Sequence, residues 1–341
     1  MIPRFPAEWE PHDATWLAWP HNAEDWPGKF EPIEWVFTEI IRAIVPGERL
    51  ELVCNTPEAA DRAGECLALS HIPLDNVRLH VLPTDRGWMR DAAPTFTRAA
   101  SSLIPIRWSF NGWAKYDNHT LDAQIPDLVS RVTELELLHA TRRDNDQPLV
   151  LEGGAIETDG QGLLLTTEEC LLHPSIQVRN PGLTRADYER AFAKYLAISR
   201  TVWLGHGCAG DDTHGHVDDL ARCTPSGAIL LAYEPDATDD NHAMSLDNEK
   251  RLLNANLPVI RLPFPAPVWF DDQRLPASYA NFYCCNAATL VPVFNDPNDR
   301  HALDVIANAF PDRPVVPIYA RDLVLGLGTI HCLTQQQPAP H

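Results

Sequence analysis

A single cysteine near the end of the chain is its best candidate for covalent chemistry. Cys332 follows His331, after an apolar run and the glycine pair Gly326 and Gly328. Glycine allows close backbone approach and positive φ, so this stretch can bend to present one side chain to a cavity. A cysteine beside a histidine is a weak motif, and a buried structural thiol explains it equally well. Cys332 is therefore a candidate nucleophile that needs partners from elsewhere in the chain.

A dense polar cluster lies between Asp211 and Asp219, and three interpretations of it compete. In the first interpretation the cluster is an acidic surface loop, as is usual for a run of charged residues. His214, His216 and Asp218 also have the HxHxD spacing of zinc hydrolases, although position 219 is aspartate where the next histidine is expected. In the third interpretation His216 is an acid/base group beside Asp218, because residues two apart in an extended segment point to the same side.

Two further segments place a carboxylate among aromatic or apolar residues. Trp88 and Asp91 lie close together in the segment 85–94. Either Arg90 and Asp91 form a surface pair worth ~0–1 kcal/mol, or an aromatic wall and a carboxylate await a planar cation. Glu152 follows an apolar run and precedes two glycines, where we expect it to pair with a histidine or a cation. A thiol, a histidine and several carboxylates together suggest nucleophilic attack on a guanidinium group.

Repeated strand–helix–strand units must position these residues. Apolar periodicity predicts such units centred near residues 65, 185, 245 and 305, and a fifth unit over 90–150, with a helix at 123–138. A doubly wound sheet gives a similar local pattern, but no GxGxxG follows the first strand, so a dinucleotide site is not expected. A ring of five ββαβ units of roughly 68 residues each fits the length and leaves a central cavity. We expect a single α/β domain over residues 1–341.

Composition narrows the classes of partner and compartment. The formal net charge is −20, from 47 acidic and 27 basic residues, which argues against nucleic acid and fits a cationic ligand or simply good solubility. The eight cysteines form no CxxC pair, and the first residues contain no apolar signal-peptide segment. No run approaches the ~20 apolar residues of a membrane span. We expect a cytoplasmic protein with reduced thiols and no membrane partner.

Longer motifs across the chain resemble those of agmatine deiminases, in the peptidylarginine-deiminase-type group of guanidine-modifying enzymes. They occur in the family's order over nearly the whole length. They are FPAEWEPH at 5–12, WMRDAAPTF at 88–96, LEGGAI at 151–156, LTTEECLL at 165–172, DTHGHVDD at 212–219, ASYANFY at 277–283, FNDPND at 294–299 and IHCLTQQQPA at 330–339.

The resemblance implies a fold and a reaction. The fold is a five-bladed α/β propeller around a central active-site cavity. Cys332 resembles the nucleophile that attacks the guanidinium carbon. His216 resembles the group that protonates the departing ammonia and then deprotonates water to release the amidino-cysteine intermediate. Glu152 resembles the carboxylate that orients His216 and raises its pKa. The reaction needs no metal or organic cofactor.

The resemblance also implies how the substrate is bound. Asp91 and Asp218 resemble the carboxylates that hold the guanidinium nitrogens, and Trp88 flanks the substrate. With agmatine the products are N-carbamoylputrescine and ammonia. Asp212 or Asp211 is placed to meet the ammonium tail of agmatine. A homodimer is possible on the resemblance alone.

Departures from the family pattern keep other functions open. The glycine-rich entry to Ile330 lacks the usual third glycine and asparagine, and positions 214 and 219 differ from the common asparagines. These changes leave the substrate tail open, so free or peptidyl arginine is an alternative substrate, favoured if a basic residue such as Arg222 or Arg261 lines the pocket. A zinc hydrolase built on His214, His216 and Asp218 and a non-catalytic polyamine binder are the remaining alternatives.

Overall fold

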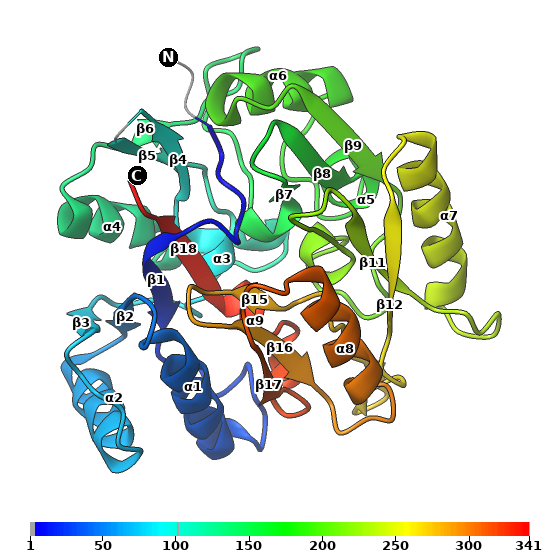
Figure 1. The fold of residues 1–341 in the computed structure, drawn as a ribbon. Coiled ribbons are helices and arrows are strands. Elements are labelled where there is room, and N and C mark those ends of the chain that lie inside the picture. The colour runs from blue at the N-terminus through cyan, green and yellow to red at the C-terminus, as the bar shows by residue number, and fades with distance from the viewer. Residues whose placement is uncertain (1–3, 101, 341) are drawn as a thin grey trace.

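The computed structural model describes residues 4–100 and 102–340, which form a mixed α/β fold (Figure 1). Over these residues the strands form five sheets of three or four strands and one two-stranded ribbon. In sheet order, these are β18 (Thr334–Pro338), β1 (His12–Ala18), β2 (Arg49–Cys54) and β3 (Val77–Val81); β4 (Thr95–Ala99), β5 (Ser102–Arg107) and β6 (Leu138–His139); β7 (Glu157–Thr158), β8 (Leu163–Thr167) and β9 (Arg200–Leu204); β10 (Ala221–Cys223), β11 (Ile229–Tyr233) and β12 (Val259–Pro263); β15 (Tyr283–Cys284), β16 (Thr289–Val293) and β17 (Val315–Tyr319); and the ribbon β13 (Trp269–Phe270) with β14 (Gln273–Arg274).

The helices are α1 (Phe30–Ile44), α2 (Pro57–Leu69), α3 (Met89–Ala92), α4 (Ile125–Thr133), α5 (Glu168–Leu172), α6 (Arg185–Leu196), α7 (Asn241–Asn254), α8 (Asp299–Ala309) and α9 (Ile330–Leu333). No helix among the described residues is long and apolar enough to cross a membrane.

The five larger sheets share one connectivity. In each, an antiparallel pair is followed by a parallel pair, as in β10–β11 and β11–β12. A parallel pair requires a crossover, and at least one helix lies in each crossover, for example α7 between β11 and β12 and α8 between β16 and β17. The repeated units expected from the sequence are therefore confirmed, including the one over 90–150.

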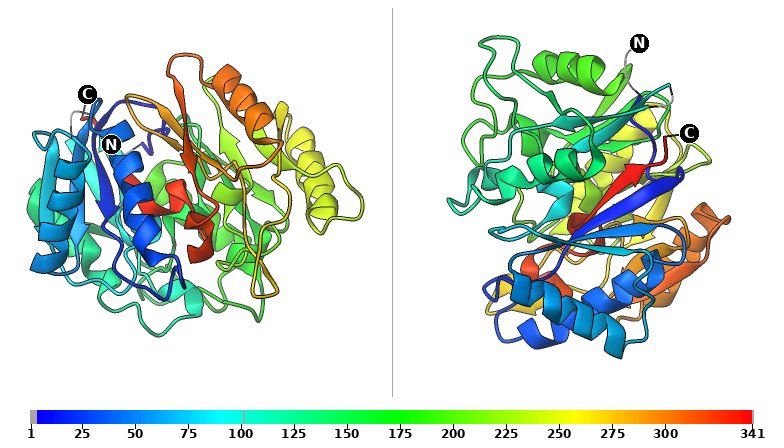
Figure 2. Two further views of the ribbon diagram at one scale, coloured as in Figure 1. Left: turned by 90° about the horizontal axis from the view of Figure 1, so that it is seen from below. Right: turned by 90° about the vertical axis from the view of Figure 1, so that its left-hand side faces the viewer.

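The two ends of the chain meet in the first sheet. β18 pairs antiparallel with β1, so that Trp16 lies opposite Gln335, and Figure 2 shows the two strands side by side. α9 leads directly into β18, so this pairing fixes the position of Cys332. The short helices α3 and α9 contact each other and lie between the sheets in Figure 1.

Local signals in the sequence set several helix boundaries. Thr56 caps α2 by accepting a hydrogen bond from the Ala59 amide, with Pro57 at the first helical position. Thr184 forms a capping box with Asp187 at the start of α6. The helix expected at 123–138 is wrong in its second half. α4 ends at Thr133 because Glu134 adopts a left-handed conformation, and residues 138–139 form β6 instead.

The apolar faces of the helices pack inward against the sheets. In α1, Ile33, Phe37, Ile40 and Ile44 recur at helical spacing and are fully buried. They belong to one large apolar cluster that also includes Trp88 and Cys332, and a second cluster lies around α6 and β8. The candidate nucleophile is thus held by the main core.

Candidate active site

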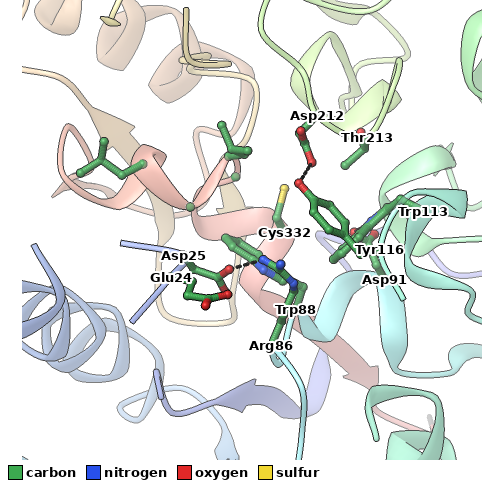
Figure 3. A pocket seen from close by; sticks show the side chains of 14 residues that line it. Glu24, Asp25, Arg86, Trp88, Asp91, Trp113, Tyr116, Asp212, Thr213 and Cys332 are labelled. Carbon is green, nitrogen blue, oxygen red and sulfur yellow. Dashed lines mark hydrogen bonds and ion pairs between the residues drawn. The ribbon is translucent and has the colours of Figure 1, made fainter. Parts of the chain in front are cut away.

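Cys332 opens onto a cavity of about 250 Å³ whose walls come from segments far apart in the sequence (Figure 3). The loop after β1, the segment before α3 and α3 itself form one side. Residues near 113–116 and 212–213 form another, and the loop before α9 completes the walls. The lining residues are Glu24, Asp25, Arg86, Trp88, Asp91, Trp113, Tyr116, Asp212, Thr213, Leu325, Gly326, Leu327, Gly328 and Cys332.

Asn281 holds the nucleophile segment in place. Its side-chain amide donates to the Cys332 Sγ at 3.1 Å, and its Oδ1 accepts hydrogen bonds from the His331 amide at 3.1 Å and the Thr329 hydroxyl at 2.8 Å. Cys332 itself is only 6% exposed. Sequence reasoning included Asn281 in a family motif but assigned it no role, because nothing in the motif says which residue its side chain meets.

The glycine pair before α9 acts through close approach, which is one of the two properties expected from the sequence, and not through positive φ, which is the other. The left-handed residue is Leu327, at φ 65°, whereas neither glycine has a positive φ. A Cβ at Gly326 would lie 2.9 Å from the Trp26 Nε1 and 3.0 Å from the Trp88 Cζ2. One at Gly328 would lie 2.9 Å from the Trp88 Cζ3. The glycines therefore let the indole of Trp88 pack flat under the nucleophile loop.

His216 lies at the centre of three carboxylates and is fully buried. Its Nδ1 lies 3.9 Å from the Asp91 Oδ1 and 4.0 Å from the Asp218 Oδ1, and its Nε2 lies 3.9 Å from the Glu152 Oε2. Burial alone would lower the pKa of His216, but the carboxylates of Asp91 and Glu152 raise it well above its usual value. Residues 217–219 form a 3₁₀ turn and not the extended segment expected, yet His216 and Asp218 still converge.

Glu152 is paired with a cation that sequence reasoning missed. The Arg179 Nε donates to the Glu152 Oε1 at 3.1 Å, and both side chains are fully buried. Burial would raise the pKa of Glu152, but Arg179 and His216 outweigh it and hold this pKa at about 2. Glu152 is thus an ionised partner for His216. The apolar setting of Glu152 indicated that it needs a partner, but no motif marks Arg179 as that partner.

Asp91 and Asp218 face the same small space. Asp91 accepts hydrogen bonds from the Trp113 Nε1 at 2.9 Å and the Gly154 amide at 3.0 Å. The Asp218 Oδ2 lies 2.7 Å from the His331 Nδ1 and 3.6 Å from the Cys332 Sγ. Of the two alternatives for this segment, the surface pair of Arg90 with Asp91 is wrong, because Arg90 is buried and contacts Glu8.

The charges around this space favour a bound cation. Burial raises the pKa of Asp91, and the neighbouring carboxylates add to that effect. Burial also raises the pKa of the Cys332 thiol well above its usual value, reinforced by Asp218, Asp219 and Asp91. Burial opposes ionisation of Asp218 too, but its hydrogen bond to His331 lowers the Asp218 pKa. A cation between these groups would therefore favour the ionised forms of both the carboxyl groups and the Cys332 thiol.

Acidic residues, Asp212 among them, line the outer part of the cavity. Asp212 lines it, but its carboxylate already pairs with Lys115 and accepts a hydrogen bond from the Tyr116 hydroxyl at 2.7 Å. On another wall, Asp25 forms an ion pair with Arg86, beside Glu24 (Figure 3). The Asp25 Oδ2 has no hydrogen-bond partner among the described residues. Burial raises the pKa of Asp25 to about 7, although Arg86 opposes the shift.

The structure does not assemble the zinc site considered from the sequence. His214 lies against Glu169, with 3.7 Å between its Nε2 and the carboxylate, and its ring packs on His173. The potential metal ligands that lie within 4.8 Å of His216 and of one another are Glu152 and Cys170. The HxHxD spacing of residues 214–218 therefore does not bring its three side chains together as a metal site.

A basic residue, Arg86, does line the cavity, where it pairs with Asp25, but neither of the two arginines named from the sequence is among the described lining residues. Arg222 is buried and pairs with Glu8 at 2.7 Å. Arg261 is at the surface and pairs with Glu249 at 2.6 Å.

Known proteins resemble this chain over nearly its whole length. Residues 4–338 match the model of the Porphyromonas-type peptidyl-arginine deiminase family. The chain is 34% identical to an agmatine deiminase of Ectopseudomonas mendocina, over 98% of this chain and 95% of the relative, and 33% identical to one of Pseudomonas aeruginosa, over 99% and 96%. The solved agmatine deiminase of Enterococcus faecalis superposes with a TM-score of 0.89 at 27% identity, covering 99% of this chain and 96% of that one. The chain belongs to the Porphyromonas-type peptidyl-arginine deiminase family.

Proposed function

We propose that this protein hydrolyses the guanidinium group of agmatine to N-carbamoylputrescine and ammonia through a covalent intermediate on Cys332. The observation that carries the proposal is the convergence of Cys332, His216, Asp91 and Asp218 on one small cavity rich in carboxylates. Relatives that match nearly the whole chain are agmatine deiminases, which supports the same reaction.

The first half of the reaction is an attack on the guanidinium carbon. Asp91 and Asp218 accept hydrogen bonds from the guanidinium nitrogens and orient the planar group over the Cys332 Sγ. The thiolate forms a C–S bond, giving a tetrahedral adduct. His216, protonated because its pKa is raised, donates a proton to one terminal nitrogen, and the C–N bond breaks to release ammonia. An amidino-cysteine remains.

The second half hydrolyses that intermediate. His216, now neutral, takes a proton from water, and the hydroxide adds to the amidino carbon. The adduct collapses to the ureido product as the C–S bond breaks and the thiolate returns. The hydroxyl proton is released and combines with ammonia. Glu152, ionised beside the His216 Nε2, stabilises the imidazolium at both stages. The two displacements replace one difficult hydrolysis.

The proposed setting of this chemistry is a single domain built as a five-bladed propeller. The shared connectivity of the five larger sheets supports that architecture, with the site between the blades. All eight cysteines are free thiols, which supports the expected cytoplasmic location.

The outer cavity favours an ammonium tail over a carboxylate tail. Glu24 and Asp25 line it, and the buried Asp25 Oδ2 has no hydrogen-bond partner in the part of the chain that the structure describes. Arg86 lines it too, but its charge is taken up by Asp25 and by the ring of Tyr116, whose centroid lies 4.4 Å away. We therefore place the ammonium end of agmatine beside Glu24 and Asp25.

The test of the reaction is a parallel assay for ureido product and ammonia on agmatine, free arginine and a short arginine peptide. We expect product from agmatine and none from Cys332→Ala. Cys54→Ala removes another buried thiol from β2, outside the cavity, and should keep the activity. Product from arginine or the peptide alone would keep the mechanism and overturn the substrate. No product from any of the three would overturn the function.

The tail contact has its own test. Glu24→Gln should lower kcat/KM on agmatine by roughly three- to fivefold, as expected for an exposed ion pair of at most about 1 kcal/mol. It should leave pentylguanidine, which carries a methyl group in place of the ammonium, unaffected. Glu31→Gln, on an exposed position of α1, is the matched control. An equal loss on both substrates would show that Glu24 does not meet the ammonium.

A further inference from the structure

A residue near the start of the chain is linked to the candidate guanidinium site through one histidine. The His331 Nδ1 lies 2.7 Å from the Asp218 Oδ2, and its Nε2 lies 2.8 Å from the Glu8 Oε2, 323 residues away in the sequence. Asp218, His331 and Glu8 are all buried. The connection exists because β18 pairs with β1, which brings the N-terminal segment under α9.

Glu8 is fixed from several sides and is therefore a firm anchor. Its Oε1 accepts hydrogen bonds from Arg222 at 2.7 Å and from the Cys284 amide at 2.9 Å, and its Oε2 also faces Arg90 at 3.2 Å. Burial opposes its ionisation, but Arg222, His331 and Arg90 lower the pKa of Glu8 well below its usual range. A carboxylate held by two guanidinium groups stays ionised and cannot easily turn away.

Two carboxylates, those of Asp218 and Glu8, lie on either side of the His331 ring. Asp218 and Glu8 are both ionised acceptors, since the pKa of each is lowered. The His331 ring lies between two carboxylate oxygens, 2.7 Å from its Nδ1 and 2.8 Å from its Nε2, and a ring that donates to both at once carries a proton on each nitrogen. The charged groups that face it are these two carboxylates, with Arg90 and Arg222 behind Glu8.

This arrangement leaves one oxygen of Asp218 for the substrate. His331 occupies Oδ2, whereas Oδ1 is buried, has no hydrogen-bond partner among the described residues and faces the His216 Nδ1 at 4.0 Å. Without the hydrogen bond to His331, Asp218 would lie beside Asp91 and Asp219 with His216, 4.0 Å away, as its remaining positive neighbour, and it would take up a proton more readily. A protonated or rotated Asp218 could not receive a guanidinium nitrogen as an ionised acceptor.

We propose that His331, anchored by Glu8, is a positioning residue that keeps Asp218 ionised and turns its Oδ1 toward the substrate. The inference rests on the proposed deiminase function. His331 does not touch the substrate; it acts through Asp218. It also explains why a glutamate in the N-terminal segment belongs to the site.

The kinetic test compares His331→Gln and Glu8→Gln with wild type on agmatine across pH. His331→Gln should lower kcat/KM at pH 7 by roughly 10- to 100-fold, as expected for loss of a charge-assisted hydrogen bond. The acid limb of the pH profile should move to higher pH, because the pKa of Asp218 is no longer lowered and the ionised form is the active one. Glu8→Gln should shift the limb in the same direction, and the double variant should be no worse than His331→Gln alone.

A matched control is His12→Gln. His12 is another buried histidine of the same segment, with its ring nitrogens 3.1 Å from the Glu48 Oε1 and 2.7 Å from the Glu8 carbonyl oxygen, but it does not contact Asp218. It should leave the acid limb in place even if it lowers Tm. An acid limb unchanged in folded His331→Gln, or shifted equally by His12→Gln, would overturn the proposal while leaving the deiminase function standing.

A second measurement reads the histidine without using activity. Nitrogen-15 NMR of the wild type near pH 8 should show two protonated ring nitrogens on His331, assigned by their loss in His331→Gln. A single neutral tautomer would overturn the proposal even in a protein that deiminates nothing. Wild type that converts no guanidine would instead overturn the proposed function.

Discussion

The tightest point of the site is Gly154, and one added methyl group there tests the whole arrangement. A Cβ built on Gly154 would lie 2.5 Å from the His216 Nδ1, 3.0 Å from the Asp91 Oδ1 and 3.1 Å from the Asp218 Oδ2. These are the groups proposed to hold and protonate the guanidinium. Gly154 does not have a positive φ, so alanine fits the backbone there and the effect is purely one of space.

The size of the effect follows from that spacing. Ordinary contacts of a Cβ lie near 3.4–4 Å, so the 2.5 Å approach forces His216 or the Gly154 backbone to move by roughly 1 Å. A 1 Å misplacement of a catalytic group costs about 100-fold in rate. We therefore expect Gly154→Ala to lower kcat/KM on agmatine by roughly 100-fold or more, with a clear part of the loss in kcat.

The assay is steady-state ureido formation from agmatine, with Tm measured on the same samples. Gly64→Ala is the matched control, because a Cβ there meets nothing within 4 Å and the residue lies inside α2. It should keep full activity and stabilise the fold by roughly 0.5–1 kcal/mol. Gly154→Ala with kcat/KM within threefold of wild type would refute the claim that His216, Asp91 and Asp218 converge on the reacting group.

Three further predictions follow from single contacts. Arg179→Met leaves Glu152 buried without its cation. Because the folded-state pKa of Glu152 is held near 2, its ionised form stabilises the fold above about pH 4.5, and this contribution fades as the pH falls toward 2. The variant should therefore have a lower Tm than wild type at pH 7, and the difference in Tm should narrow in acid. Thr56→Ala removes the cap of α2 and should lower the free energy of unfolding by about 1 kcal/mol, measured by urea titration, with activity unchanged. A non-reactive guanidinium ligand should lower the pKa of the Cys332 thiol, measured as thiolate absorbance that is absent in Cys332→Ala. A wild-type titration curve that is the same with and without the ligand would contradict cation-assisted ionisation.

The sequence predicted the repeated elements well because their signals are local. Thr56 and Pro57 mark the start of α2, and a capping box marks the start of α6, within a few residues of each boundary. The end of α4 was missed because Glu134 carries no sign of its left-handed conformation. For the glycines before α9 the sequence left close approach and positive φ both open, since their need for space depends on Trp88, which is distant in sequence.

The site was predictable where a residue's own chemistry restricts its role. Glu152, flanked by leucine and glycine, needed a partner, and it has one in Arg179. The choice of Arg179 among 27 basic residues depends on the packing of separate segments, and no spacing rule expresses that. The same holds for Asn281 beside the thiol and for Glu8 under His331. Asp212 shows the same limit for the substrate tail. Its charge made it a plausible partner for an ammonium group, but nothing in the sequence shows that its carboxylate also contacts Lys115 and Tyr116.

The remaining question is why a buried thiol beside carboxylates should be reactive at all. In the free protein the excess of negative groups raises the pKa of both Cys332 and Asp91, so each resists ionisation for the same reason. A guanidinium placed between them reverses both effects, because it is the positive charge that the cavity lacks. In the proposed mechanism, the bound substrate therefore helps to create the thiolate that attacks it. A neutral ligand of the same shape would leave the thiol protonated, so selection for a cation and activation of Cys332 are one electrostatic property of the same carboxylates.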